Sequence, residues 1–130
     1  MRKIVRKNPD FLPEPVGNYC HVTRIPKEAD LIVTSGQVGT DEYGNISDVF
    51  NIQVEHCFKN IDKLLRSENI SEENVVKVNI WATEEIDWDF FYGKWGELFA
   101  KNYPSMTVAY ISKLGLPSLK IEIELWCAVM

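Results

Sequence analysis

Long apolar runs are missing from this sequence, and so is a secretion leader at its start. A membrane-spanning helix needs about 20 consecutive apolar residues, and the apolar runs here are far shorter. The chain begins Met1, Arg2, Lys3, Ile4, Val5, without the apolar segment and small-residue cleavage site of a signal peptide. These absences predict a cytoplasmic protein with no membrane span.

Cysteine and histidine are scarce. Cys20, Cys57 and Cys127 are odd in number and far apart, which indicates reduced thiols rather than a disulfide framework. His21 and His56 have no partners at the spacing of metal ligands, and no glycine-rich phosphate loop is present. The sequence therefore predicts no bound metal and no cofactor.

Basic residues are outnumbered by acidic ones. The chain has 14 Lys and Arg residues and 19 Asp and Glu residues, which gives a net charge of −5. Nonspecific affinity for nucleic acid comes mainly from clustered cations, so the composition argues against that partner. Only Arg2, Lys3, Arg6 and Lys7 gather, and a mobile, solvated end is a simpler interpretation of them than a nucleic-acid arm.

The hydrophobic content is that of an ordinary globular domain. The chain has 130 residues, of which 45% are hydrophobic and 25% charged, and a domain of this size buries roughly two thirds of its extended surface. No repeat, low-complexity tract or linker interrupts it. We expect a single domain over residues 1–130.

Alternation, helical periodicity and turn residues predict the element order ββαβαββ. Strands are expected at 20–25 and 31–35, joined as a hairpin, then at 75–82, 107–113 and 119–129. The first helix carries an apolar stripe from Phe50 to Leu65, with Ser47 or Asp48 as its N-cap; the second begins at the N-cap Asp87 and ends before Pro104. This order indicates an α+β domain with both helices on one face of a mixed sheet, which leaves the other face for self-association.

Two places could carry chemistry. In the last strand, alternation puts Glu122 and Glu124 on one face, as either a general acid/base pair or two solvated strand residues. Ser35 and Gly36 close a strand that reads as buried, where free amides could bind a small anion or a carbonyl oxygen. The aromatic stripe of the second helix, which includes Tyr92, is more simply explained by packing on the sheet than by ligand stacking.

Several of these segments together resemble the RidA/YjgF family, also named for endoribonuclease L-PSP. The resemblance runs from Gly17 to Ala128 and is carried by residues 34–39, by the helix residues Gln53, Phe58, Asn60, Ile61 and Leu64, by Tyr103 and Pro104, and by residues 120–124. It implies a chorismate-mutase-like fold and a homotrimer with sites in the clefts between subunits.

The resemblance also implies which residues form the site. Glu122 falls on the glutamate that positions or activates water, and the cleft would be lined by Tyr19, Ser35, Gly36, Tyr92, Met106 and Thr107. In the active deaminases of the family, the residue two after the proline is an arginine that grips the substrate carboxylate. Here it is Met106, and losing such a bidentate pair should cost about 2 to 5 kcal/mol of substrate binding.

A second departure is Tyr92, where many relatives carry asparagine, and it should make the pocket narrower and more apolar. Arg24, Lys113 and Lys120 could each substitute for the missing cation, but each is more simply a surface charge. Weak or absent hydrolysis of 2-aminoacrylate is therefore expected.

Three functions follow from the resemblance and its departures. The first is a hydrolase or deaminase acting on an imine, enamine or related C–N bond. The alternative is a noncatalytic small-ligand-binding or regulatory trimer. An endoribonuclease is the least favoured, because the chain is acidic and lacks a basic, aromatic-studded surface.

Overall fold

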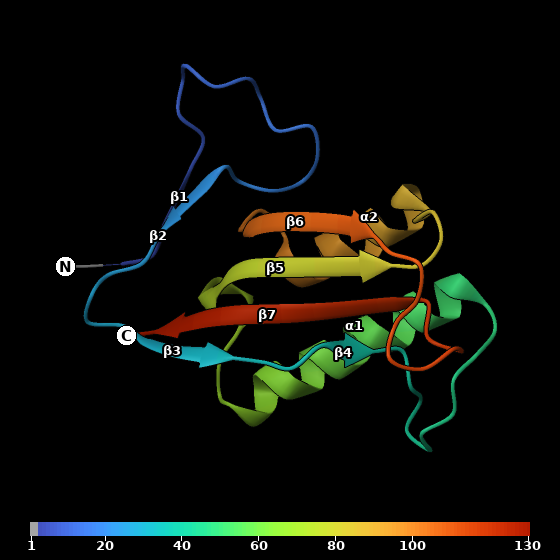
Figure 1. Cartoon of the computed structure of the whole chain (residues 1–130). Helices are drawn as coiled ribbons and strands as arrows, with labels where there is room; N and C mark the ends of the chain where they lie inside the picture. The colour runs from blue at the N-terminus through green and yellow to red at the C-terminus, as the bar shows by residue number, and fades with distance from the viewer. Residues whose placement is uncertain (1–2) are drawn as a thin grey trace.

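A mixed β-sheet forms the centre of the computed structural model, which describes residues 3–130 (Figure 1). Its strands lie in the order β3 (Asp30–Val33), β7 (Ile121–Val129), β5 (Val75–Ala82) and β6 (Ser105–Tyr110), and β4 (Gln37–Val38) also pairs with β7. β5 and β6 are parallel, while β3, β4 and β5 are antiparallel to β7. The predicted α+β domain with a mixed sheet is confirmed.

Two helices cover one face of this sheet, as predicted. In Figure 1, α1 (Phe50–Ser67) and α2 (Trp88–Phe99) both lie behind the strands, and α2 is the crossover that the parallel β5–β6 pair requires. Ile61 and Trp95 from the helices pack with Ile80 and Ile123 from the strands, and each is at most 1% exposed. Within residues 3–130, no helix combines the length and apolar character needed to cross a bilayer.

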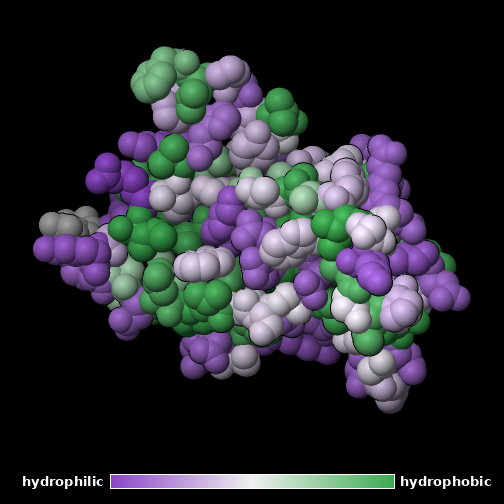
Figure 2. All heavy atoms as spheres, viewed as in Figure 1, coloured by the Kyte–Doolittle hydropathy of each residue, from purple (hydrophilic) through white to green (hydrophobic). Residues whose placement is uncertain are grey.

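The opposite face of the sheet, which we call the open face, is not covered by any helix or strand of the part of the chain that the structure describes. It carries Leu31, Val33 and Trp126, which are 54%, 53% and 40% exposed. Polar side chains fill its middle, where Asn79 Nδ2 donates to Glu124 Oε1 at 3.0 Å. Figure 2 views this face, with hydrophobic atoms gathered toward the β3 end and hydrophilic atoms near the centre.

The expected hairpin between residues 20–25 and 31–35 is wrong. β2 (Val22–Arg24) pairs with β1 (Val5–Lys7) in a separate two-stranded sheet, whereas β3 pairs with β7 at the far end of the chain. The turn at 26–29 does form, since the N–H of Ala29 donates to the carbonyl of Pro26. It leads the chain from one sheet to the other instead of folding it back on itself.

The interpretation of the basic start as a mobile end is also wrong for Arg6 and Lys7. Both belong to β1, and Arg6 Nη2 donates to the carbonyls of Glu73 and Val75 at 2.7 and 2.8 Å. These bonds tie the N-terminal strand to the 3₁₀ turn Glu72–Asn74 and the start of β5. Arg2 lies outside the described residues.

One of the two predicted helix caps is wrong. The N-cap of α1 is Val49, not Ser47 or Asp48, and its side chain caps nothing. Ser47 instead closes a local turn by accepting the N–H of Val49 at 3.1 Å. The predicted cap of α2 is confirmed, because Asp87 accepts the N–H of Phe90.

The two closing strands are shorter than predicted. β6 spans 105–110 rather than 107–113, and β7 begins at Ile121 rather than Leu119. Both limits follow from β5, whose last residue, Ala82, pairs with Tyr110 on one side and Ile121 on the other. Beyond Ala82, β6 and β7 have no strand residue of β5 with which to form hydrogen bonds.

The strand predicted at 31–35 also ends earlier than expected, and it is not buried. β3 is an edge strand that ends at Val33, and Ser35 is exposed.

Stability should fall in alkaline solution because thiols are buried against the sheet. Burial raises the pKa of Cys127 from an ordinary 9.0 to about 11. A thiol that stays protonated in the folded state stabilises it fully below pH 9.0, and this contribution is lost at about 1.4 kcal/mol per pH unit as the unfolded thiol ionises. Urea titrations of wild type and Cys127→Ala under reducing conditions should therefore give free energies of unfolding that converge between pH 9 and about 11.

Ile123→Val is the control for this prediction. It also removes buried volume from the helix-facing side of β7 but removes no ionisable group, so its free-energy difference from wild type should stay constant over the same pH range. A constant difference for Cys127→Ala would contradict the assignment.

Candidate functional site

A pocket of about 570 Å³ lies between α2, β6 and the segment 16–19. It contains three of the residues expected at the site, Tyr19, Tyr92 and Met106. Sequence reasoning did not assign the remaining lining residues to the site, and they are Val16, Gly17, Trp88 and Val108. Two of these could have been found from pattern alone: Trp88 lies one helical turn before Tyr92, and Val108 shares the strand face of Met106.

The 16–19 segment is clamped to α2 at this pocket. Tyr92 Oη accepts the N–H of Asn18 at 3.3 Å, and Trp95 Nε1 donates to the Asn18 carbonyl at 2.8 Å. A Cβ at Gly17 would overlap Tyr92 Oη, so the tyrosine needs glycine opposite it. Tyr92 thus occupies one wall of the pocket, beside the Trp88 ring at a centroid distance of 5.0 Å.

Among residues 3–130, no charged residue lines this pocket. Met106 faces it from β6, where its thioether can offer only weak acceptor character. Of the three cations considered as substitutes, Lys120 pairs with Glu84 at 3.4 Å, and Arg24 and Lys113 are exposed outside the lining. The pocket wall of a single chain is therefore aromatic and apolar, which suits an uncharged ligand group better than a carboxylate.

Glu122 lies on the other side of the sheet from Met106. Register places Glu122 opposite Trp81 and Met106 opposite Val78, and these belong to opposite faces of β5. Glu122 is half-buried, and its carboxylate makes no hydrogen bond or ion pair with any residue in 3–130. A half-buried carboxylate that has no hydrogen-bond or ion-pair partner is available to a water molecule or a ligand.

Gly36 lies directly against this carboxylate. A Cβ at position 36 would overlap the Glu122 side chain, so glycine is what allows the backbone to approach. The Ser35 carbonyl is occupied by Thr34 Oγ1 at 2.8 Å and Gln37 Nε2 at 3.1 Å. The structure thus places Gly36 against Glu122, with Ser35 next to Gly36 in the chain.

Two other strand residues are taken up by structural contacts. Thr107 Oγ1 accepts from Lys77 Nζ at 2.7 Å on the open face, so it does not share the pocket with its neighbour Met106. Glu124 accepts from Asn79. Of the two carboxylates that the alternation placed together, only Glu122 is left free.

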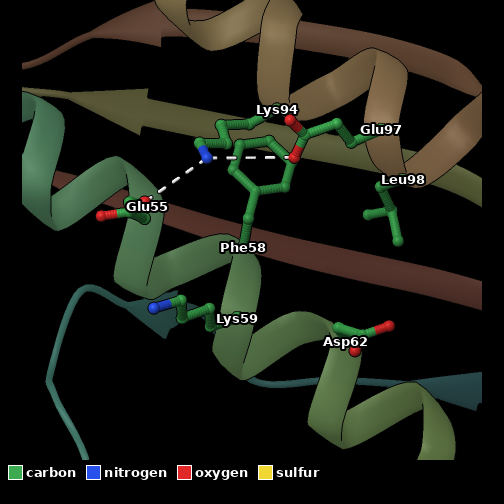
Figure 3. Close-up of a pocket in the computed structure, with 7 residues that line it drawn as sticks. All are labelled: Glu55, Phe58, Lys59, Asp62, Lys94, Glu97 and Leu98. Atoms are coloured by element: carbon green, nitrogen blue, oxygen red, sulfur yellow. Dashed lines mark hydrogen bonds and ion pairs between the residues drawn. The ribbon is translucent and has the colours of Figure 1, made fainter.

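A groove between the helices is a poorer candidate. In Figure 3, Lys94 reaches from α2 toward Glu55 of α1 and toward Glu97, at 3.4 and 3.9 Å. Its ammonium also lies 5.6 Å from the centroid of the Phe90 ring. These charges satisfy one another, and the groove contains none of the residues expected at the site.

Comparisons with known proteins agree with this architecture. The sequence profile described as Endoribonuclease L-PSP matches residues 11–129. A RutC family protein of Buchnera aphidicola is 29% identical over 115 residues, which cover 86% of each chain. Another, from Aquifex aeolicus, is 36% identical over 73 residues, and this match spans 55% of the present chain and 56% of that protein. The crystal structure of the Rid-family protein YyfB of Yersinia pestis superposes with a TM-score of 0.83 at 18% identity, covering 97% of this chain and 98% of that one.

Proposed function

This chain belongs to the endoribonuclease L-PSP family, also known as RidA/YjgF, and from that premise we propose a homotrimer whose intersubunit clefts bind a small molecule. The apolar corner of the open face, formed by Leu31, Val33 and Trp126, supports self-association, because such a patch gains stability when it is covered. A closed cyclic assembly covers equivalent faces of every copy at once.

The separation of the expected site residues carries the proposal. Tyr19, Tyr92 and Met106 lie in one pocket, while Gly36 and Glu122 lie across the sheet from it. A small ligand cannot touch Met106 and Glu122 of the same chain. In a cleft between subunits, the Met106 pocket of one copy faces the Glu122 carboxylate of the next copy. Each cleft then contains both the pocket and the carboxylate.

In this cleft Glu122 is the acid/base residue. Its carboxylate accepts a proton from water, the water oxygen attacks the carbon of a C=N bond, and the proton returns to the nitrogen. The carboxylate then takes the proton of the new hydroxyl group and passes it to the nitrogen, so that the C–N bond breaks, a carbonyl forms and the amine leaves. The backbone N–H groups at Ser35 and Gly36 hold a polar head of the ligand. The pocket around Met106 takes a group without negative charge, so 2-aminoacrylate and related imino acids are poor substrates.

A noncatalytic small-ligand-binding trimer is the alternative. The apolar wall at Met106 and Trp88 favours this alternative, because such a wall can bind a ligand but carries no acid, base or nucleophile. Ribonuclease activity remains least favoured. The net charge of −5 opposes binding of a polyanion, and activity on RNA that depends on Glu122 would reverse this ranking.

Val33→Glu is expected to break the trimer. It puts a charge into the apolar corner of the open face, and a desolvated, unpaired carboxylate costs several kcal/mol at an interface. Sedimentation equilibrium should change from three times the 15.0 kDa chain mass to that mass. Leu116→Glu is the matched control, because Leu116 is 54% exposed and Val33 is 53% exposed, but Leu116 lies in the loop before β7. A wild-type monomer, or a trimeric Val33→Glu variant, would contradict the proposed assembly.

A further inference from the structure

A second pocket, of about 410 Å³, lies where β1 meets the segment that follows α2. Arg6 and Lys7 reach it from the strand, and Lys101 reaches it from the segment. None of the described residues that line it is acidic. Three cations therefore share one concave site in a chain whose net charge is −5, and such a concentration of positive charge favours an anion.

Arg6 is fixed in the wall of this pocket. Its Nη2 donates to the carbonyls of Glu73 and Val75, which immobilises the guanidinium. Its Nε is enclosed by protein atoms and has no hydrogen-bond partner, so Arg6 contributes to the site through its fixed charge and not through Nε. A guanidinium is always charged and is well suited to recognise an oxyanion.

Neutral donors and rigid walls complete the site. Asn8, which also lines it, uses Oδ1 to accept the N–H of His21 at 2.8 Å, so its amide hydrogens are the part left for a ligand. The N–H of Cys20 bonds to the carbonyl of Pro104 at 3.2 Å. This bond joins two sides of the pocket that are distant in sequence, so the site is built before any ligand arrives.

Arg6 keeps its positive charge in this pocket, because an arginine guanidinium is not deprotonated in proteins. Burial lowers the pKa of the guanidinium, and it outweighs the opposing attraction of Cys20, Glu73 and Glu72. Partial burial strengthens a charge-assisted hydrogen bond to any ligand that enters, because water competes less well there.

From this arrangement we propose that the pocket binds the phosphate group, or a comparable dianionic oxyanion, of a small molecule, with Arg6, Lys7 and Lys101 as its cations. A volume of about 410 Å³ accommodates one such group together with an organic portion. Tyr19 lines both this pocket and the one that contains Met106, so the two sites adjoin. The anion site does not depend on the acid/base role of Glu122.

Inorganic phosphate is the probe that tests this proposal. In ¹⁵N-labelled full-length protein at constant ionic strength, phosphate should shift the amide signals of Cys20 and residues 101–103 saturably. The double variant Lys7→Ala/Lys101→Ala should weaken binding by about tenfold or more. Lys27→Ala/Lys113→Ala, which removes the same charge from exposed positions elsewhere, should leave the dissociation constant unchanged.

Competing anions separate the chemical classes. Acetate should bind more weakly than phosphate if a dianion is the preferred ligand. Absence of saturable shifts, or equal weakening by both double variants, would overturn the site. A single-stranded RNA that displaces phosphate far more tightly than a phosphate monoester does would overturn the assignment to a small molecule.

Discussion

Replacing Met106 by arginine and Tyr92 by asparagine together should raise pyruvate release from enzymatically generated 2-aminoacrylate by about 30-fold or more. The arginine restores a fork of N–H donors on β6, and a bidentate pair with the substrate carboxylate contributes about 2 to 5 kcal/mol. The measurement is kcat/KM at low salt, because this interaction acts on substrate capture.

The asparagine is needed because Tyr92 occupies the wall of the same pocket. Its hydroxyl bonds to the N–H of Asn18 and leaves no room for a side chain at Gly17. Met106→Arg alone is therefore expected to raise the activity less than the double variant does. Met106→Leu with Tyr92→Asn is the control, since it opens the same space without a cation and should leave the activity at the wild-type level. No gain from the arginine would count against the geometry assigned to the cleft.

Glu122→Gln should lower the turnover of any C=N substrate by about 10² to 10⁴, the usual contribution of a positioned acid/base group. Glutamine has nearly the same shape, so the contact with Gly36 and the fold are preserved. The experiment is done in the Met106→Arg/Tyr92→Asn variant, where turnover is measurable, with ligand affinity followed in parallel.

Glu124→Gln is the matched control. Glu124 has the same side chain two residues along the same strand face, but its carboxylate already accepts from Asn79, so its replacement should leave kcat unchanged. An equal loss of turnover in both variants would indicate a structural effect and would contradict the acid/base role of Glu122. Retained affinity with no turnover in any variant would favour the noncatalytic alternative.

Elements with strong local periodicity were predictable from the sequence. β7 alternates as expected, with Ile121, Ile123 and Leu125 buried, and both helices follow their apolar stripes. The pairing of β3 with β7 was not predictable. These strands are far apart in the sequence, and no short turn connects them. β1 and β4 were missed, since strands of three and two residues are too short for alternation to show.

The structure brings some of the residues named from the sequence together and separates others. Tyr19 and Met106 share a pocket, and Gly36 adjoins Glu122. Met106 and Thr107 are adjacent in a strand and so cannot face the same way, a signal that was present in the sequence. Trp88, the first residue of α2, also lines the pocket.

The most direct test of the central claim, that an apolar side chain at position 106 leaves the cleft unable to hold a carboxylate, uses the unmodified protein. Pyruvate release from 2-aminoacrylate is measured side by side with a relative that carries arginine at the corresponding position. We predict that the present protein is slower by about 30-fold or more, the equivalent of a lost bidentate pair. Turnover as fast as that of the arginine-bearing relative would contradict the account.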